Sequence, residues 1–346
     1  MSRIKMPLPP MEATVVDEIP RGQQWQYEPK WDGFRCIAFR RGKKAELQSK
    51  SGKPLTRYFP EVAADLLKLR SESFVLDGEI VIPIGSRLSF NDLLMRIHPA
   101  ASRIRKLSSE TPATYIVFDL LEDNTGALTD LALEKRRKRL ERFAKQEFHR
   151  AERIVISPAT CEIKIARRWF ASAGKALDGI VAKRTDLEYR ADDRTGMQKI
   201  KRQRTADCVV GGFRYATKGR IVGSLLLGLY DDQGMLNHVG YTSSIAHSER
   251  AALTRKLKKL ISPPGFTGNA PGGPSRWSTK RSTEWEPLKP KLVVEVEYDH
   301  FTGGRFRHGT KFIRWRPDKA PRQCKMEQVK SSGAATFRLL HRNGKA

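Results

Sequence analysis

A lysine with unusual neighbours is the first residue whose type and spacing suggest chemistry. Lys30 lies between Glu28 and Trp31, and a glycine turn at Gly33 and a strand-like segment follow it. The pattern predicts that the aliphatic part of the Lys30 side chain is packed and that its amine faces a pocket. Such burial disfavours the charged ammonium form. A free lysine has a pKa of about 10.4, and about one molecule in a thousand is uncharged at neutral pH. Desolvation and nearby cations would raise that fraction and make Lys30 a nucleophile.

Two further lysines are spaced so as to bind an anion. Lys199 and Lys201 alternate with Gln198 and Ile200, and on a strand this places both ammonium groups on one face. Such groups repel each other unless an anion lies between them. The spacing therefore favours a phosphate-binding strand, whereas a lysine elsewhere in the chain is more simply a surface charge.

Two acidic residues and one aromatic residue are the remaining candidates for a functional site. Asp77 and Glu79 flank Gly78 at the end of an apolar run, where they point the same way unless the glycine bends the chain. This acidic triplet is either a plain β-turn or a strand end whose carboxylates face a cleft. Phe118 lies in the apolar run YIVFDLL, and spacing alone does not separate a core position from a ring face offered to a base.

Short strands and helices in irregular alternation must position these residues. The pattern predicts an α+β fold with antiparallel sheets in the first part of the chain. The expected strands are Phe34–Phe39, Phe74–Ile82, Thr114–Leu121, Ile154–Ser157 and Gly179–Lys183, and the expected helices are Pro60–Lys68, Leu131–Phe143 and Ile163–Ala173.

The pattern changes after the polar stretch KRQRTAD at residues 201–207, which we interpret as a hinge. Short strands with glycine-rich turns then surround one helix, Ser248–Leu260, which predicts a small OB-type β-barrel. The expected strands are Cys208–Phe213, Ser224–Tyr230, His238–Tyr241, Leu292–Tyr298 and Lys311–Arg316. We therefore expect a first domain over residues 1–201, an OB domain over 202–330 and a basic tail over 331–346.

Composition points to a polyanionic partner. The chain of 346 residues has 65 Lys and Arg against 38 Asp and Glu, a net charge of +27, with 39% hydrophobic residues that suit folded domains. The surplus is +11 over residues 1–201 (38 basic, 27 acidic) and +16 over residues 202–346 (27 basic, 11 acidic). No long apolar run or secretory signal is present, which predicts a cytoplasmic protein at the nucleoid and no membrane partner. The four cysteines (Cys36, Cys161, Cys208 and Cys324) are scattered singly, so neither zinc nor disulfides are expected.

The segment KWDGFR, which contains Lys30, resembles the K-x-D-G-x-R motif of covalent nucleotidyltransferases: DNA ligases, RNA ligases and mRNA capping enzymes. The other motifs of that superfamily follow in order, over Ser49–Gly52, Leu76–Glu79, Val117–Asp119, Asp178–Lys183, Gln198–Lys201 and Arg316–Lys319. The length and order most resemble short bacterial ATP-dependent DNA ligases, which consist of a nucleotidyltransferase domain and an OB domain.

The resemblance implies a role for each matching residue. Lys30 would attack the α-phosphorus of ATP, with Asp32 orienting its site. Glu28 would lie at the adenine edge, Phe118 would stack on the base, and Arg35 and Glu79 would meet the ribose and each other. The phosphates would be bound by Lys50, Lys183, Lys199 and Lys201, and Mg²⁺, with Mn²⁺ as an alternative, by Asp32, Glu79 and Asp178.

Two residues depart from the usual motifs of the superfamily, and one motif lies in the other domain. Asp178 stands where the superfamily more often has Glu, which shortens its reach to a metal, and Lys50 stands where Arg is more usual and lacks a bidentate fork. Arg316, Asp318 and Lys319 belong to the OB domain, so they can orient the pyrophosphate only if that domain closes over the cleft.

The sequence thus predicts a monomeric ATP-dependent DNA ligase that seals nicks through a lysyl-AMP intermediate, in DNA repair, with a Ku-like protein or a repair polymerase as partner. An upstream NAD⁺ domain and a helical DNA-binding domain are not expected, so basic stretches at Arg87–Ser108 and Ser262–Ser278 would contact nicked duplex DNA. The alternatives are an RNA ligase, a GTP-using capping enzyme, and a basic DNA-binding protein without activity.

Overall fold

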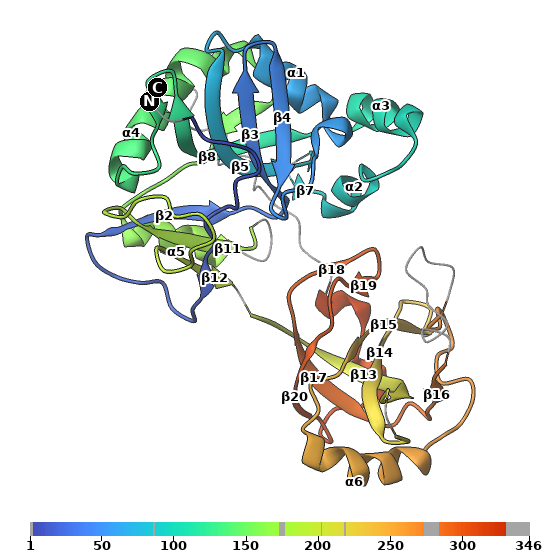
Figure 1. Cartoon of the computed structure of the whole chain (residues 1–346). Coiled ribbons are helices and arrows are strands. Elements are labelled where there is room, and N and C mark those ends of the chain that lie inside the picture. Colours follow the sequence, from blue (N-terminus) through green and yellow to red (C-terminus); the bar gives the residue numbers. More distant parts are fainter. Residues whose placement is uncertain are drawn as a thin grey trace. The chain divides into compact units, whose positions relative to one another are not determined.

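A computed structural model describes residues 3–85, 87–172, 177–201, 203–217, 219–272 and 284–329. The chain divides into two compact units, with the division between Arg202 and Gln203 (Figure 1). The predicted tail at 331–346 and the end of the predicted loop at Ser262–Ser278 lie outside the described residues. None of the described helices is long and apolar enough to cross a membrane.

Unit 1 contains two sheets. The first has the order β1-β12-β11-β2, with β1 Thr14–Val15, β12 Met197–Lys201, β11 Gly179–Arg184 and β2 Trp25–Lys30. The second has the order β10-β8-β5-β3-β4, with β10 Ile154–Ile156, β8 Thr114–Asp123, β5 Ser73–Val81, β3 Phe34–Arg41 and β4 Lys44–Ser49, and β9 Gly126–Ala127 pairs with β8. Within these two sheets, only β1 with β12 and β10 with β8 are parallel pairs.

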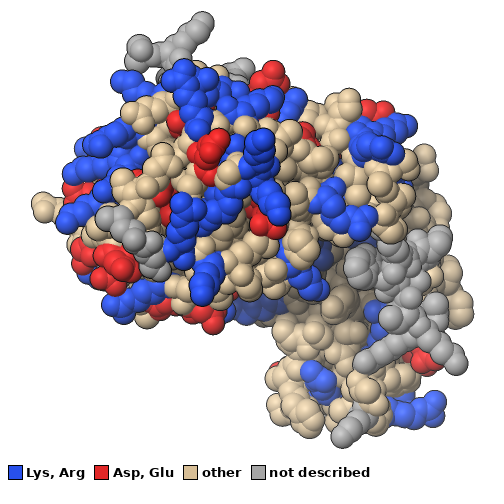
Figure 2. Space-filling model, turned by 45° about the horizontal axis from the view of Figure 1, so that its top comes forward, with Lys and Arg blue, Asp and Glu red and all other residues tan. Residues whose placement is uncertain are grey.

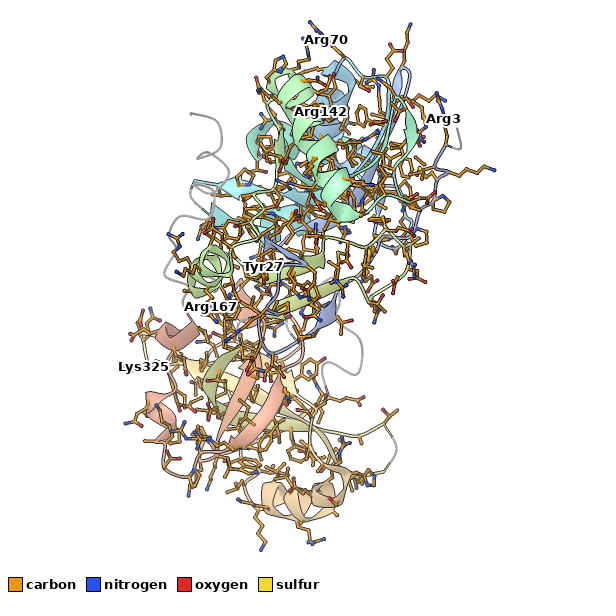
Figure 3. The ribbon with its side chains drawn as sticks, turned by 90° about the vertical axis from the view of Figure 1, so that its left-hand side faces the viewer. Arg3, Tyr27, Arg70, Arg142, Arg167 and Lys325 are labelled. Carbon is orange, nitrogen blue, oxygen red and sulfur yellow. The ribbon has the colours of Figure 1, made fainter. Side chains whose placement is uncertain are left out.

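Helices surround these sheets. Unit 1 also contains a separate small hairpin, formed by β6 Pro83–Ile84 and β7 Arg87–Leu88. The helices are α1 Pro60–Lys68, α2 Phe90–Met95, α3 Ala101–Glu110, α4 Leu133–Glu147 and α5 Ile163–Ser172, with 3₁₀ turns at Thr56–Tyr58 and Phe148–Arg150. Figure 3 shows Arg142 on α4, Arg167 on α5 and Tyr27 within the first sheet. The α+β fold with mainly antiparallel sheets is confirmed, and α2 and α3 fall in a stretch to which the sequence assigned no helix.

Unit 2 is a sheet that closes on itself. Its order is β15-β14-β13-β17-β20, with β15 Leu236–Thr242, β14 Val222–Tyr230, β13 Arg204–Tyr215, β17 Val293–Tyr298 and β20 Lys311–Trp315. A bridge between Thr242 and Thr310 joins β15 to the start of β20, so the two edges of the sheet meet. The remaining elements are α6 His247–Lys258, β16 Glu286–Pro287, the hairpin β18 Phe301–Thr302 with β19 Arg305–Phe306, and 3₁₀ turns at Pro321–Gln323 and Met326–Val329.

The lysine motif is the crossover between the two sheets of unit 1. Lys30 is the last residue of β2 in the first sheet, and β3 of the second sheet begins at Phe34. Gly33 permits this crossover because a Cβ atom there would lie 2.2 Å from the carbonyl oxygen of Ile80. The two sheets therefore diverge at the point where Lys30 ends one strand and Phe34 begins the next.

A buried ion pair fixes α1 against α2. The Arg96 guanidinium is fully buried and donates two hydrogen bonds of 2.8 Å to the two carboxylate oxygens of Glu61. It also donates to the backbone carbonyl of Tyr58, at 2.7 Å, and Glu61 accepts a hydrogen bond from the backbone N–H of Ala113. Removal of either partner would leave a buried charge without compensation.

We expect Arg96→Met to lower the free energy of unfolding by about 3 kcal/mol or more, because Glu61 would keep its charge in a buried position. Urea denaturation of the purified protein measures the change. The control is Lys106→Met, which removes an exposed pair with Glu110 at 3.8 Å and should change stability by less than about 0.5 kcal/mol. Equal effects of the two substitutions would show that the buried pair has no special importance.

Candidate active site

One pocket of unit 1 collects most of the predicted site residues. It encloses an empty volume of ≈ 780 Å³, which includes its open mouth. Its lining includes the predicted Glu28, Lys30, Arg35, Lys50, Glu79, Phe118, Lys183 and Lys199. These residues come from both sheets and from the crossover, so the pocket exists only because the two sheets meet at Lys30.

The Lys30 ammonium is surrounded by carboxylates. Its Nζ donates to Asp178 Oδ2, and Lys201 Nζ lies 3.6 Å from the same oxygen. Burial lowers the pKa of Lys30, but the bonded Asp178, together with Glu79 and Asp32, outweighs burial and leaves this pKa above its ordinary value. The prediction of an uncharged amine is therefore wrong for this state of the protein, because sequence spacing did not show that Asp178 bonds to the lysine.

Lys199 is the lysine with a lowered pKa. Burial is the main cause, and the neighbouring cations Lys30, Lys201 and Lys50 add to it. Lys199 lies opposite Val181 of β11 and Val15 of β1, so it occupies the middle of the first sheet. The strand spacing predicted from the sequence is confirmed here: both lysines lie on β12, Lys199 lines the pocket, and Lys201 lies beside Asp178.

Glu79 lies beside Lys30, and its pKa is raised. One carboxylate oxygen accepts a hydrogen bond of 3.1 Å from the backbone N–H of Gly33. Loss of solvation raises the pKa of Glu79 to about 7, although Lys30 and Arg35 act in the opposite direction. Glu79 therefore exchanges a proton near neutral pH.

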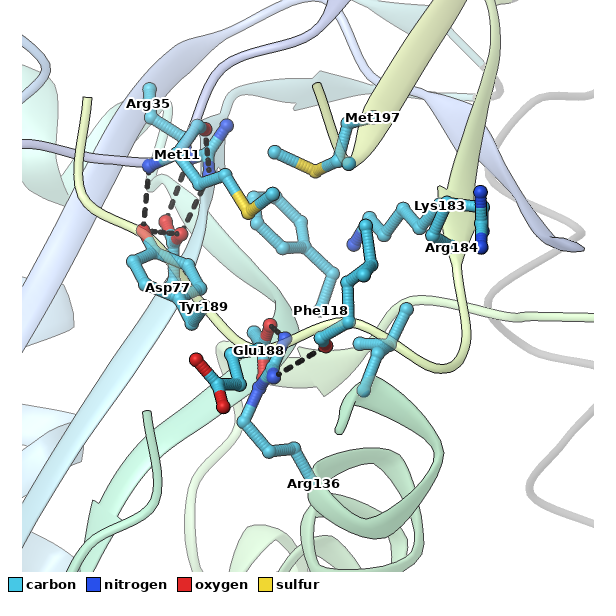
Figure 4. Close-up of a pocket in the computed structure, with 14 residues that line it drawn as sticks. Met11, Arg35, Asp77, Phe118, Arg136, Lys183, Arg184, Glu188, Tyr189 and Met197 are labelled. Atoms are coloured by element: carbon cyan, nitrogen blue, oxygen red, sulfur yellow. Dashed lines mark hydrogen bonds and ion pairs between the residues drawn. The ribbon is translucent and has the colours of Figure 1, made fainter. Parts of the chain in front are cut away.

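Arg35 is held by a partner that the sequence did not identify. It lies opposite Glu79 in the strand register, yet its guanidinium donates two hydrogen bonds of 2.6 Å to Asp77. Tyr189 also donates to Asp77, at 2.7 Å, and accepts from the backbone N–H of Met11, at 3.0 Å (Figure 4). The expected contact of Arg35 with Glu79 is thus replaced by a buried network around Asp77, whose importance only long-range packing reveals.

Lys183 lies at a different end of the pocket from the one expected. The motif resemblance implies a phosphate contact for Lys183, but its Nζ lies 2.8 Å from Glu28 Oε1 and 4.3 Å from the centroid of the Phe118 ring. The side chain is buried, and both partners were assigned to the base. The physical reason is the register of β11 against β2, which directs Lys183 toward Glu28.

The predicted metal ligands do not form a preassembled site. Nowhere in the described part of the chain do three His, Cys, Asp or Glu side chains gather in a way that could hold a metal ion. Asp178, Glu79 and Asp32 instead share the charge of Lys30. Their carboxylate oxygens are suitable ligands for Mg²⁺, provided that phosphate oxygens complete the coordination shell.

The motif at Arg316 forms its own network within unit 2. Arg316 donates to Asp318 at 2.8 Å and to Asp207 at 2.8 Å, and Lys319 Nζ lies 3.4 Å from Asp207. These contacts raise the pKa of Arg316 and lower the pKa of Asp318 to about 2.

A segment before the first long strand also lines the pocket, and sequence reasoning missed it. Pro10, Glu12 and Ala13 belong to the lining, and Glu12 pairs with Lys50 at 2.7 Å and with Arg194 at 3.0 Å. The Lys50 hydrogen bond is the main reason why the pKa of Glu12 is lowered. No local pattern marks this segment, because its position depends on contacts with distant residues.

Fold and site together define the class of covalent nucleotidyltransferases, in which a lysine at a strand end faces a nucleotide pocket. The family model described as "ATP dependent DNA ligase domain" matches residues 10–201. The model described as "ATP dependent DNA ligase C terminal region" matches residues 218–319. The chain belongs to the ATP-dependent DNA ligase family.

Individual relatives agree with this assignment. DNA ligase C2 of Mycolicibacterium smegmatis is 43% identical over 344 residues, which cover 94% of this chain and 95% of that protein. DNA ligase C of Mycobacterium tuberculosis is 41% identical over 338 residues, covering 93% of this chain and 94% of that protein. A solved Lig E DNA ligase, 13% identical, has the same fold with a TM-score of 0.56 and covers 88% of this chain and 99% of that chain.

We expect Asp178→Asn to lower the pKa of Lys30, because the carboxylate that stabilises its ammonium form is removed. Only the uncharged amine reacts with acetic anhydride, so acetylation of Lys30 at pH 8, measured by mass spectrometry, should become faster. Lys138, an exposed lysine on α4, is the internal control and should react at the same rate in both proteins. An unchanged rate at Lys30 would contradict the assigned role of Asp178.

Proposed function

We propose that the protein seals nicks between a 5′-phosphate and a 3′-hydroxyl in duplex DNA, and that AMP is carried on Lys30. The observation that supports this most directly is the position of Lys30 in the pocket. It lies between the cationic side chains of β12 and a buried patch formed by Glu28, Lys183 and Phe118. A nucleoside triphosphate whose α-phosphorus faces Lys30 could extend its phosphates toward the former and its base toward the latter.

The first step is the transfer of AMP to the lysine. A bond forms from Lys30 Nζ to the α-phosphorus of ATP, the bond from that phosphorus to the bridging oxygen breaks, and pyrophosphate leaves. Lys30 must first lose a proton and its hydrogen bond to Asp178. Glu79 lies close enough to act on the charge of Lys30, and its pKa of about 7 makes it a suitable acceptor for that proton.

Two further displacements at phosphorus complete the reaction. The 5′-phosphate of the nick attacks the α-phosphorus of the lysyl-AMP and releases Lys30, and the 3′-hydroxyl then attacks the activated 5′-phosphate and releases AMP. Lys199 and Lys201 would bind phosphate oxygens in each step, because all three reactions place negative charge at the same position. Lys50 would join them after it leaves Glu12.

A divalent cation fits the carboxylates near Lys30. Mg²⁺, or Mn²⁺, held by phosphate oxygens together with Asp178, Glu79 and Asp32 would neutralise charge on the phosphates. Asp178 binds the Lys30 ammonium in this structure, so a cation held there would compete with the ammonium for this carboxylate. Such competition would favour release of the amine.

The remaining assignments are also proposals. Arg316, Asp318 and Lys319 would act on the pyrophosphate, which requires Arg316 and Lys319 to leave Asp207. Adenine recognition by Glu28 and stacking on Phe118 would favour ATP over GTP, and a repair role would bring a Ku-like protein or a repair polymerase as partner. Nicked DNA would be held by charge: Lys and Arg side chains are spread over the face seen in Figure 2.

Incubation with α-labelled ATP and Mg²⁺ should give a covalent protein–AMP adduct that is stable to alkali, labile to acid as expected for a phosphoramidate, and absent from Lys30→Ala. The lysine nitrogen is the only atom of that side chain able to attack phosphorus. Lys43→Ala, which removes a lysine outside the pocket lining, is the control and should retain the adduct. Labelled GTP should give little adduct, and a chase with nicked DNA should seal the nick and discharge AMP. An adduct that forms only with GTP, or sealing only of nicked RNA, would contradict the proposal.

Affinity for nicked duplex DNA should fall about 100-fold or more between 50 and 200 mM salt, because bound lysine and arginine side chains release counterions. Arg105→Ala/Lys106→Ala on α3 should weaken binding and reduce the salt slope by about 2. The matched control removes Lys135 and Lys138, which lie on α4, and should leave the slope unchanged. Fluorescence anisotropy of a labelled nicked duplex measures these slopes, and equal slopes for the three proteins would exclude α3 from the DNA contact.

A further inference from the structure

Three polar side chains are brought together on one face of the first sheet. Gln26 and Glu28 are two residues apart on β2, so they point to the same side. Lys183 of β11 lies directly opposite Gln26 in the antiparallel register, and Val181 lies opposite Glu28. The register therefore places the Gln26 amide and the Lys183 ammonium next to the Glu28 carboxylate.

Both neighbours bind the same oxygen of Glu28. Gln26 Nε2 donates to Glu28 Oε1 at 2.9 Å, and Lys183 Nζ lies 2.8 Å from Oε1. The three residues are only 5%, 2% and 5% exposed for Gln26, Glu28 and Lys183. Glu28 lines the pocket, and in the described part of the chain no side chain or backbone group is bonded to its other oxygen, Oε2. One oxygen is thus fixed by the protein and the other is available to a ligand.

The Lys183 ammonium is occupied on two sides. It pairs with Glu28, and it lies 4.3 Å from the centroid of the Phe118 ring, within the range of a cation–π contact. A cation with these two partners and almost no solvent exposure is held in place. It is therefore a poor donor to any further group at that position of the pocket.

We propose that Gln26 and Lys183 are positioning residues that set the choice of nucleobase. They hold Glu28 so that Oε2 can only accept a hydrogen bond, which suits the 6-amino group of adenine and leaves the 6-oxo group of hypoxanthine or guanine without a donor. Commitment of the Lys183 ammonium to Glu28 and Phe118 withholds a cation that could otherwise bind a 6-oxo group, and the Arg35 guanidinium beside the same ring is held by Asp77. This inference rests on the proposed function, and it concerns how Glu28 is fixed.

Burial of an amide and an ammonium group in one patch supports a specific role. Each would carry a desolvation cost without its hydrogen bond, and an apolar pair would fill the same space on the sheet at lower cost. What the arrangement provides is a carboxylate with one defined orientation.

The test compares ATP with ITP. Their bases differ at the 6-position, which is an amino group in ATP and an oxo group in ITP, and in the proton that N1 carries in ITP. For Gln26→Met, single-turnover formation of the nucleotidyl-lysine adduct should show a preference for ATP over ITP reduced about tenfold, because Glu28 loses one of its two fixing bonds. This loss of preference should come mainly from a higher ATP concentration at half-saturation. The maximal rate should stay within about twofold of the wild type. Gln48→Met is the matched control: Gln48 is also fully buried and bonded, to the backbone of Leu8, and the ATP/ITP ratio should not change.

A second variant separates positioning from simple loss of structure. The exchange Gln26→Lys/Lys183→Gln keeps one amide and one ammonium at opposite positions of the register, so it should restore part of the ATP preference lost in Gln26→Met. An unchanged ATP/ITP ratio in Gln26→Met, or a loss of maximal rate with an unchanged ratio, would overturn the inference. Failure of the wild-type protein to form any adduct with ATP would instead overturn the proposed function, so the two failures are distinguishable.

Discussion

The hydrogen bond between the Lys30 ammonium and Asp178 is the interaction on which the rest of the site depends. A buried cation requires compensation, and here a bonded carboxylate supplies it, with Glu79 and Asp32 adding to the attraction. The Lys30 amine is consequently held as an ammonium group in this structure. Any ligand that bound Asp178 would weaken this hold, which is why the proposed chemistry depends on this one contact.

The same principle recurs in the other charged groups of the protein. Arg35 is held by Asp77, Lys183 by Glu28, Lys50 by Glu12, and Arg316 by Asp207 and Asp318. A strongly basic chain of net charge +27 would repel itself if these cations were uncompensated. Each pair also selects one orientation of its cation, so the carboxylates determine which positive charges remain available to phosphate. Lys199, whose pKa is lowered, is the exception within the pocket.

The crossover at residues 31–33 explains why one short motif can contribute to several parts of the site. Because β2 ends at Lys30 and β3 begins at Phe34, the residues on either side belong to different sheets. Glu28 is directed toward Gln26 and Lys183, and Arg35 toward the Asp77 network, while Lys30 lies between them along the chain. The close approach of Gly33 to the backbone of Ile80 shows how little space this arrangement leaves for another residue.

The sequence by itself determined the α+β class, the family and most of the residues that meet in the pocket, because these follow from local spacing and from an ordered series of motifs. Lys199 and Lys201 illustrate this: period-two spacing on a strand is a local property, and it was predicted correctly. The tertiary structure alone decided the charge of Lys30, the partner of Arg35 and the position of Lys183. Each of these depends on a residue far along the chain, namely Asp178, Asp77 and Glu28, and on the register between strands. Distances of a few ångströms between such residues control electrostatics, and no pattern within a short segment encodes them.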